Sequence, residues 1–101
     1  MANAAYDGPI IDAHHHFWDL GLNRHPWLAN PAEHAFLRRD HLVADYLKLA
    51  AGTGIVATVH AEANWDPADP LGETEWLDRL DRPAGIASRY VAYAALGAPD
   101  A

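Results

Sequence analysis

The chain has 101 residues, enough for one small domain, and its 50% hydrophobic content is ordinary for a folded globular protein. Seven basic residues against 14 acidic ones give a formal charge of -7, which disfavours binding to nucleic acid or to anionic membrane surfaces. Cysteine is absent, so any metal ligand must be His, Asp or Glu. The sequence shows neither a signal-peptide pattern nor an apolar run long enough to span a bilayer, and we expect a cytoplasmic protein.

The first expected elements are a strand over residues 10–17 and a long ordered loop over residues 20–40. Ile10 and Ile11 are β-branched and open the strand, whose polar side chains gather toward its C-terminal end. The loop contains two prolines and shows neither helical nor strand periodicity.

A helix and a second strand are expected next. Asp40 is a plausible N-cap, apolar residues then recur at helical spacing, and Gly52 supplies a C-terminal stop. The following run at residues 55–59, IVATV, is short and rich in β-branched residues, which predicts a strand buried on both faces.

The C-terminal part predicts a second helix and a third strand. LGETEWLDRL, residues 71–80, places Trp76 at helical spacing, where it is expected to pack between helix and sheet. A strand is expected within residues 86–96, which include YVAYAAL. Strands alternating with helices predict an α/β fold with a parallel sheet, whose functional groups gather at the C-terminal ends of the strands.

Three consecutive histidines close the first predicted strand in the segment IDAHHHFWD. Because alternate side chains of a strand share a face, only two of the three can act together. We expect His14 and His16 to face the sheet interior and to bind one zinc-like ion, with Asp12 on the same face orienting a ring. The face toward the covering helices is expected to hold Ile11, Ala13 and His15. The alternatives are a purification tag, which normally lies at a terminus, and histidines that only pack or contact solvent.

Further candidates follow the first two strands. His60 and Glu62 share an i, i+2 relation and are expected to face the same mouth, where they would bind substrate hydroxyls; the alternative is that they satisfy loop backbone groups or contact solvent. Trp18 is expected to line a pocket for a sugar-like ring, although packing of the loop explains it equally well. Three histidines without ligand spacing are expected to be solvated or capping: His25, His34 and His41.

IDAHHHFWDL followed by NRHPWL resembles the opening of the amidohydrolase superfamily, in its amidohydrolase-2 branch of sugar-lactone and pyrone-dicarboxylate lactonases. IVATVHAEAN, GETEWLDRL and YVAYAALGAPDA resemble the second strand, second helix and third strand of that branch. The resemblance therefore covers nearly all of residues 10–101. It implies that residues 1–101 are the N-terminal part, about three strands and two helices, of a TIM-type (β/α)8 barrel whose remainder is absent from this chain.

The resemblance also implies an activity and a site. His14 and His16 would bind a divalent metal, zinc first, or would contact substrate directly in metal-free members. Glu62 would contact the substrate, a small-molecule lactone, and the general-base aspartate is expected beyond residue 101. The implied reaction is hydrolysis of a sugar-acid lactone or related cyclic ester by activated water, and residues 1–101 alone are expected to be inactive.

Two alternatives remain beside this hydrolase. The first is a metal-dependent decarboxylase of the same superfamily. The second is a non-catalytic fragment, because three strands without closure expose an edge and apolar faces that favour self-association or binding to the remainder of the barrel.

Overall fold

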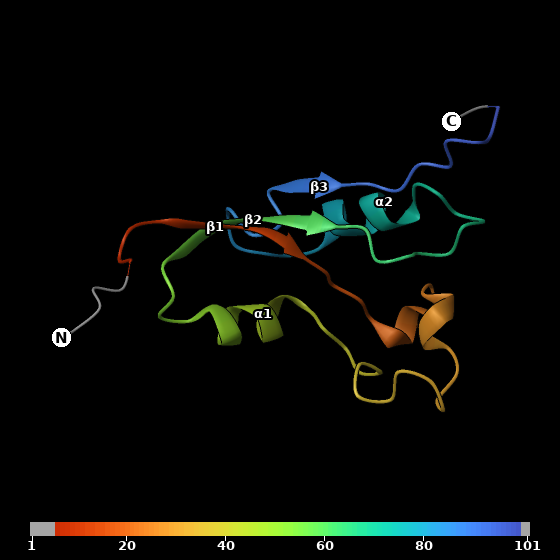
Figure 1. Ribbon diagram of the computed structural model, residues 1–101, viewed down its shortest axis with the longest axis horizontal. Coiled ribbons are helices and arrows are strands. Elements are labelled where there is room, and N and C mark those ends of the chain that lie inside the picture. Colours follow the sequence, from red (N-terminus) through yellow and green to blue (C-terminus); the bar gives the residue numbers. More distant parts are fainter. Residues whose placement is uncertain (1–5, 100–101) are drawn as a thin grey trace.

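The computed structural model describes residues 6–99, which form an open three-stranded parallel sheet with two helices (Figure 1). The strands pair in chain order, β1 with β2 and β2 with β3, so the predicted α/β class with a parallel sheet is confirmed. Within the described residues, neither helix is long and apolar enough to cross a membrane. The elements in chain order are β1 (Ile10–His15), α1 (Val43–Ala50), β2 (Ile55–Ala61), α2 (Gly72–Arg79) and β3 (Arg89–Val91).

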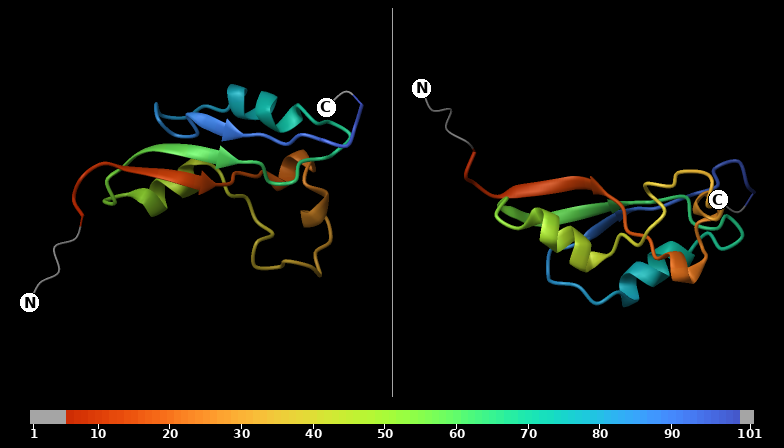
Figure 2. Two further views of the ribbon diagram at one scale, coloured as in Figure 1. Left: turned by 45° about the horizontal axis from the view of Figure 1, so that its top comes forward. Right: turned by 90° about the horizontal axis from the view of Figure 1, so that it is seen from below.

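Both helices lie on one side of the sheet, as Figure 2 shows most plainly in its right-hand view. The main core lies on this side, and the prediction that Trp76 packs between helix and sheet is confirmed. No element of the described chain covers the other side, where Ile11 is 66% exposed. The core consists of Phe17, Leu77, Ile86 and Ala87, with Val43, Tyr46, Trp76, Leu80 and Tyr90 packed against it.

Two strand predictions are corrected by the structure. The prediction that the second strand is buried on both faces is wrong, because Val56 is 56% exposed and the helices cover one side only. The third strand lies within residues 86–96, as expected, but it comprises only Arg89–Val91, so most of the run YVAYAAL is outside it. Its ladder ends where its partner ends: the Glu62 N–H donates to the Val91 carbonyl, at 2.9 Å, and the chain then turns at Asn64, whose φ is 57°.

Helix α1 begins later than its predicted N-cap. The Asp40 carboxylate does not cap the helix but accepts from the Leu20 N–H at 2.9 Å. Asp45 in the first turn accepts from the Leu42 N–H at 3.0 Å, and Leu42 is the residue that precedes the helix. The helix starts late because the neighbouring His41 is held in extended pairing with Trp18.

The loop between β1 and α1 is ordered, as predicted, and it contains two short 3-10 helices, Leu20–Leu22 and Pro26–Leu28. Its two ends meet where Trp18 and His41 exchange backbone hydrogen bonds of 2.9 and 3.0 Å. A second apolar cluster fixes the loop against the end of β2. This cluster consists of Trp18, Leu28 and Ala63, with Leu20, Trp27 and Leu37 packed against it.

Gly85 occupies a position that only glycine fits well. Its φ is 92°, a conformation that residues with a Cβ rarely adopt, and an added Cβ would overlap the Val56 carbonyl oxygen. We expect Gly85→Ala to lower the free energy of unfolding by about 2 kcal/mol, measured by urea denaturation. Gly97→Ala is the matched control, because a Cβ there meets nothing within 4 Å. Equal stability of the two variants would contradict the prediction.

Candidate functional site

An irregularity in β1 decides which histidine faces which side. Asp12 pairs with Thr58 and His15 pairs with His60, so β1 advances one residue more than β2 over the same stretch. Such a bulge interrupts the alternation of side chains. In a regular strand, residues two or four positions apart lie on the same face. When the bulge lies between two such residues, they lie on opposite faces.

His14 and His16 converge on the uncovered side of the sheet. Their Nε2 atoms lie 3.3 Å apart, and their rings are nearly perpendicular, at 85°. The Nδ1 of His16 lies 2.8 Å from the Ala61 carbonyl oxygen, which can only accept, so this nitrogen carries the hydrogen. In the neutral ring the Nε2 of His16 therefore carries the lone pair, which faces the Nε2 of His14 and can accept a hydrogen bond from it or bind a metal ion.

Asp12 and His15 lie on the helix side. The Tyr46 hydroxyl of α1 donates to the Asp12 carboxylate at 2.5 Å, and this bond holds the pKa of Asp12 below its usual value. Burial and the same bond raise the pKa of Tyr46. The His15 ring packs 4.8 Å from that of Tyr46. The Asp12 carboxylate accepts from the His14 backbone N–H at 3.2 Å, but it lies on the opposite side of the sheet from the His14 and His16 rings, and the Ala61 carbonyl takes the orienting role predicted for Asp12.

The bulge also corrects the predicted helix-facing set. His15 does face the helices, and its Nε2 lies 2.7 Å from the Thr58 hydroxyl oxygen. Ile11 and Ala13 do not: Ile11 precedes Asp12, which contacts α1, and both side chains are exposed. Strand alternation alone predicted one side of the bulge correctly and reversed the other.

His60 lies in the core. It is 1% exposed, and its Nε2 accepts from the Phe17 N–H at 3.0 Å. Burial lowers the pKa of His60 to about 3, with further lowering from His15 and His16. The side chain predicted to face the mouth is instead enclosed between sheet and helices, where a substrate cannot contact it.

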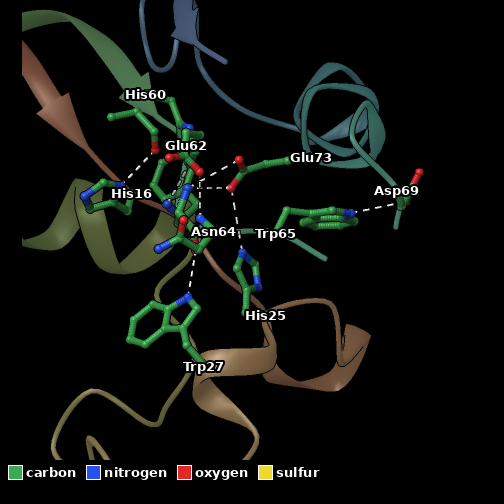
Figure 3. Close-up of polar contacts among 12 residues, drawn as sticks. His16, His25, Trp27, His60, Glu62, Asn64, Trp65, Asp69 and Glu73 are labelled. Atoms are coloured by element: carbon green, nitrogen blue, oxygen red, sulfur yellow. Dashed lines mark hydrogen bonds and ion pairs between the residues drawn. The ribbon is translucent and has the colours of Figure 1, made fainter. Parts of the chain in front are cut away.

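Glu62 lies directly after β2, beside His16 (Figure 3). Its carboxylate accepts from the Asn64 N–H at 2.8 Å, which holds it close to the turn. Glu62 does not complete a metal site with His14 and His16. Among residues 6–99, no three His, Asp or Glu side chains lie close enough to hold one ion.

Trp18 packs the loop. It is buried, its indole N–H donates to the Arg39 carbonyl at 2.8 Å, and its ring lies 4.8 Å from that of His41. The packing alternative that the sequence left open is the one the contacts favour. His34 is exposed as predicted, whereas His41 is partly buried and is not simply solvated.

His25 and Glu73 form a buried pair that was not predicted from the sequence (Figure 3). Glu73, in the first turn of α2, is 6% exposed and accepts from the Ala63 N–H at 3.2 and 3.3 Å. His25 is 4% exposed, and its Nε2 lies 3.7 Å from the Glu73 carboxylate, so it is not solvated. It does stand at the N-cap position of the Pro26–Leu28 helix, as the capping alternative expected, but its side chain makes no capping hydrogen bond. An acidic residue in the first turn of a helix is usually explained by its favourable interaction with the helix dipole. No local sequence pattern indicates that Glu73 contacts the distant His25.

Comparison with known proteins gives one curated relative and no activity. Uncharacterized protein y4mH of Sinorhizobium fredii (strain NBRC 101917 / NGR234) is 34% identical to this chain over 100 residues. The match covers 93% of this chain and 34% of y4mH, so the chain spans about a third of that relative's length. No family model and no solved structure matches the chain.

Proposed function

We propose that this chain is the first part of a TIM-type (β/α)8 barrel hydrolase of the amidohydrolase-2 type, acting on a sugar-acid lactone or related cyclic ester. The resemblance of IDAHHHFWDL and the later segments supports this, as does a parallel sheet whose strands pair in chain order. A closed barrel takes about 250 residues. The greater length of y4mH is consistent with a domain larger than this chain.

The convergence of His14 and His16 is the observation that carries the proposal. Two imidazole ligands of one tetrahedral zinc ion, each about 2.0 to 2.1 Å from the metal, have nitrogens about 3.3 Å apart. The Nε2 atoms of this pair lie 3.3 Å apart, and the Ala61 carbonyl holds His16 in the tautomer that a ligand needs. The pair fits a divalent ion, with zinc as the first choice.

His14, His16 and Glu62 would have different roles in the proposed hydrolysis. A bound divalent ion would polarise the lactone carbonyl and lower the pKa of a water molecule. His14 and His16 would hold this ion. Glu62, at the end of the neighbouring strand, would accept a hydrogen bond from a substrate hydroxyl. The proton-transferring aspartate would come from outside residues 1–101. We therefore expect this chain to bind its ligands weakly and not to turn them over, since catalytic zinc sites usually have three protein ligands.

The His14→Ala, His16→Ala double variant tests the metal assignment. We expect the wild-type chain to bind Zn²⁺ or Co²⁺, followed by calorimetry and elemental analysis, and the double variant to lose this binding entirely. Both side chains lie outside the core clusters, so the far-ultraviolet circular dichroism should be unchanged. His34→Ala, at an exposed histidine, should bind metal as wild type does. Unchanged metal content in the double variant, or no binding by wild type, would overturn the assignment.

A non-catalytic alternative rests on the uncovered side of the sheet. Ile11 of β1 and Val91 of β3 are exposed there, and each outer strand presents an unpaired backbone edge. If residues 1–101 act alone, we expect them to pair with a second copy of themselves through this surface. Size-exclusion chromatography with light scattering should then show a concentration-dependent dimer or larger assembly. A monomer at every concentration would contradict this alternative.

A further inference from the structure

An aromatic pocket lies next to the C-terminal ends of β2 and β3. Its volume is about 270 Å³, and three chain segments far apart in the sequence contribute to it. It contains neither His14 nor His16. The residues that line it are Pro26, Trp27, Asn64, Trp65, Pro67 and Tyr93.

The two tryptophans of this aromatic pocket are held in place by their own indole groups (Figure 3). The N–H of Trp27 donates to the Ala63 carbonyl at 2.8 Å, and the N–H of Trp65 donates to the Asp69 carboxylate at 3.1 Å. Both donors are therefore used inside the protein. The rings can offer a ligand only their carbon surfaces, and the bond to Asp69 makes the Trp65 ring richer in electrons.

The charges around the pocket are mainly negative. No Lys, Arg, Asp or Glu is among the lining residues, but a small cavity that shares Trp65 and Tyr93 is lined also by Asp66, Asp69 and Glu73. Arg24 lies 3.7 Å from Asp66 and offsets one of these carboxylates, and a further cavity that shares Trp65 is lined also by Glu75 and Arg79. The charge of the whole chain, -7, acts in the same direction. An anion is repelled from this site and a cation is attracted.

We propose that this aromatic pocket binds a small organic cation of the trimethylammonium class. Electron-rich ring surfaces with carboxylates close behind them attract such a cation, which needs no hydrogen-bond donor. Metal ions are disfavoured because no carboxylate lines the pocket. A polyhydroxylated ring is disfavoured because only Asn64 and Tyr93 offer polar side-chain groups, so most of its hydroxyls would lose water without gaining partners. The inference is independent of the proposed hydrolase activity.

Choline and its uncharged isostere 3,3-dimethylbutan-1-ol separate charge from shape. In a titration of the metal-free 101-residue chain followed by NMR, choline should bind in the millimolar range and shift the indole N–H signals of Trp27 and Trp65. The alcohol should bind about tenfold more weakly, and added salt should weaken choline alone. Equal binding of the two, binding of methyl glucoside in place of choline, or no shift with choline would overturn the proposal.

Two variants and a matched control locate the site. Tyr93→Ala removes one ring of the pocket and should weaken choline about fivefold, whereas Tyr6→Ala removes an exposed tyrosine elsewhere and should not. Asp69→Asn keeps an acceptor for the Trp65 indole but removes the charge. It should weaken choline about threefold and leave the alcohol unchanged. If Asp69→Asn does not weaken choline, or if Tyr6→Ala weakens it as much as Tyr93→Ala, the assignment fails.

Discussion

Replacing Arg82 with methionine should lower the free energy of unfolding by about 3 kcal/mol, because a half-buried guanidinium satisfies acceptors of several segments at once. Arg82 joins the end of α2 to the turn before β3, and its cation also lies 5.8 Å above the Tyr90 ring. Its removal takes the guanidinium donors from these acceptors, although the Leu77 carbonyl still accepts from the Leu80 N–H at 3.1 Å. The acceptors are the carbonyls of Leu77, Leu80, Ile86 and Ala87 and the hydroxyl of Tyr90.

Two further variants make the Arg82 experiment specific. Arg82→Lys keeps the charge but cannot reach so many acceptors, so it should retain less than half of the lost stability. Arg79→Met changes an exposed arginine in the last turn of α2 and should cost less than about 0.5 kcal/mol. Urea denaturation at pH 7 measures all three. An Arg82→Met midpoint equal to that of Arg79→Met would show that the network contributes no stability.

The second large effect is a loss of stability in acid caused by His60. The unfolded chain protonates this histidine below about pH 6.5, whereas burial keeps the pKa in the folded state at about 3. Stability is therefore complete above pH 6.5 and falls as the pH drops toward 3, by an amount on the order of 4 kcal/mol. The rings of His15, the last residue of β1, and of His16 directly after it lie 5.5 and 6.3 Å from the His60 ring. Burial also lowers the pKa of His15, so its protonation acts in the same direction.

His60→Gln isolates this contribution. The glutamine amide can still accept from the Phe17 N–H but does not titrate, so the loss of stability between pH 7 and pH 5 should become shallower. His34→Gln, at an exposed histidine, should keep the wild-type slope. The measurement is urea denaturation across this pH range. An NMR titration that placed the His60 pKa near 6.5 in the folded chain would contradict the explanation.

Local patterns predicted the order of elements because each is set by its own residues. The β-branched run at residues 55–59 and the spacing around Trp76 are sufficient to place β2 and α2. The ends of elements depended on partners instead. The pairing of His41 with Trp18 decides where α1 starts, and β3 ends at Val91 because its partner β2 ends at Ala61.

The candidate site was predictable only where local alternation survives. His14 and His16 meet as expected because they lie on the same side of the bulge. Asp12 lies on the other side of the bulge, and no residue pattern in IDAHHHFWD predicts that β1 contains a bulge there. His60 points to the side of β2 that strand alternation gives it, but that side is covered by the helices and the core instead of being open to a substrate.

The pairing of Trp18 with His41 has a consequence for how this protein can vary. The backbone bonds between them fix the two ends of residues 19–40, and within this segment Trp27 and Leu28 pack against Ala63. The entropic cost of closing a loop rises slowly with loop length, so doubling the length of this loop would cost only about 0.6 kcal/mol. Homologues can therefore lengthen or shorten the exposed residues 29–36 while the histidine triplet before the loop and α1 after it keep their positions.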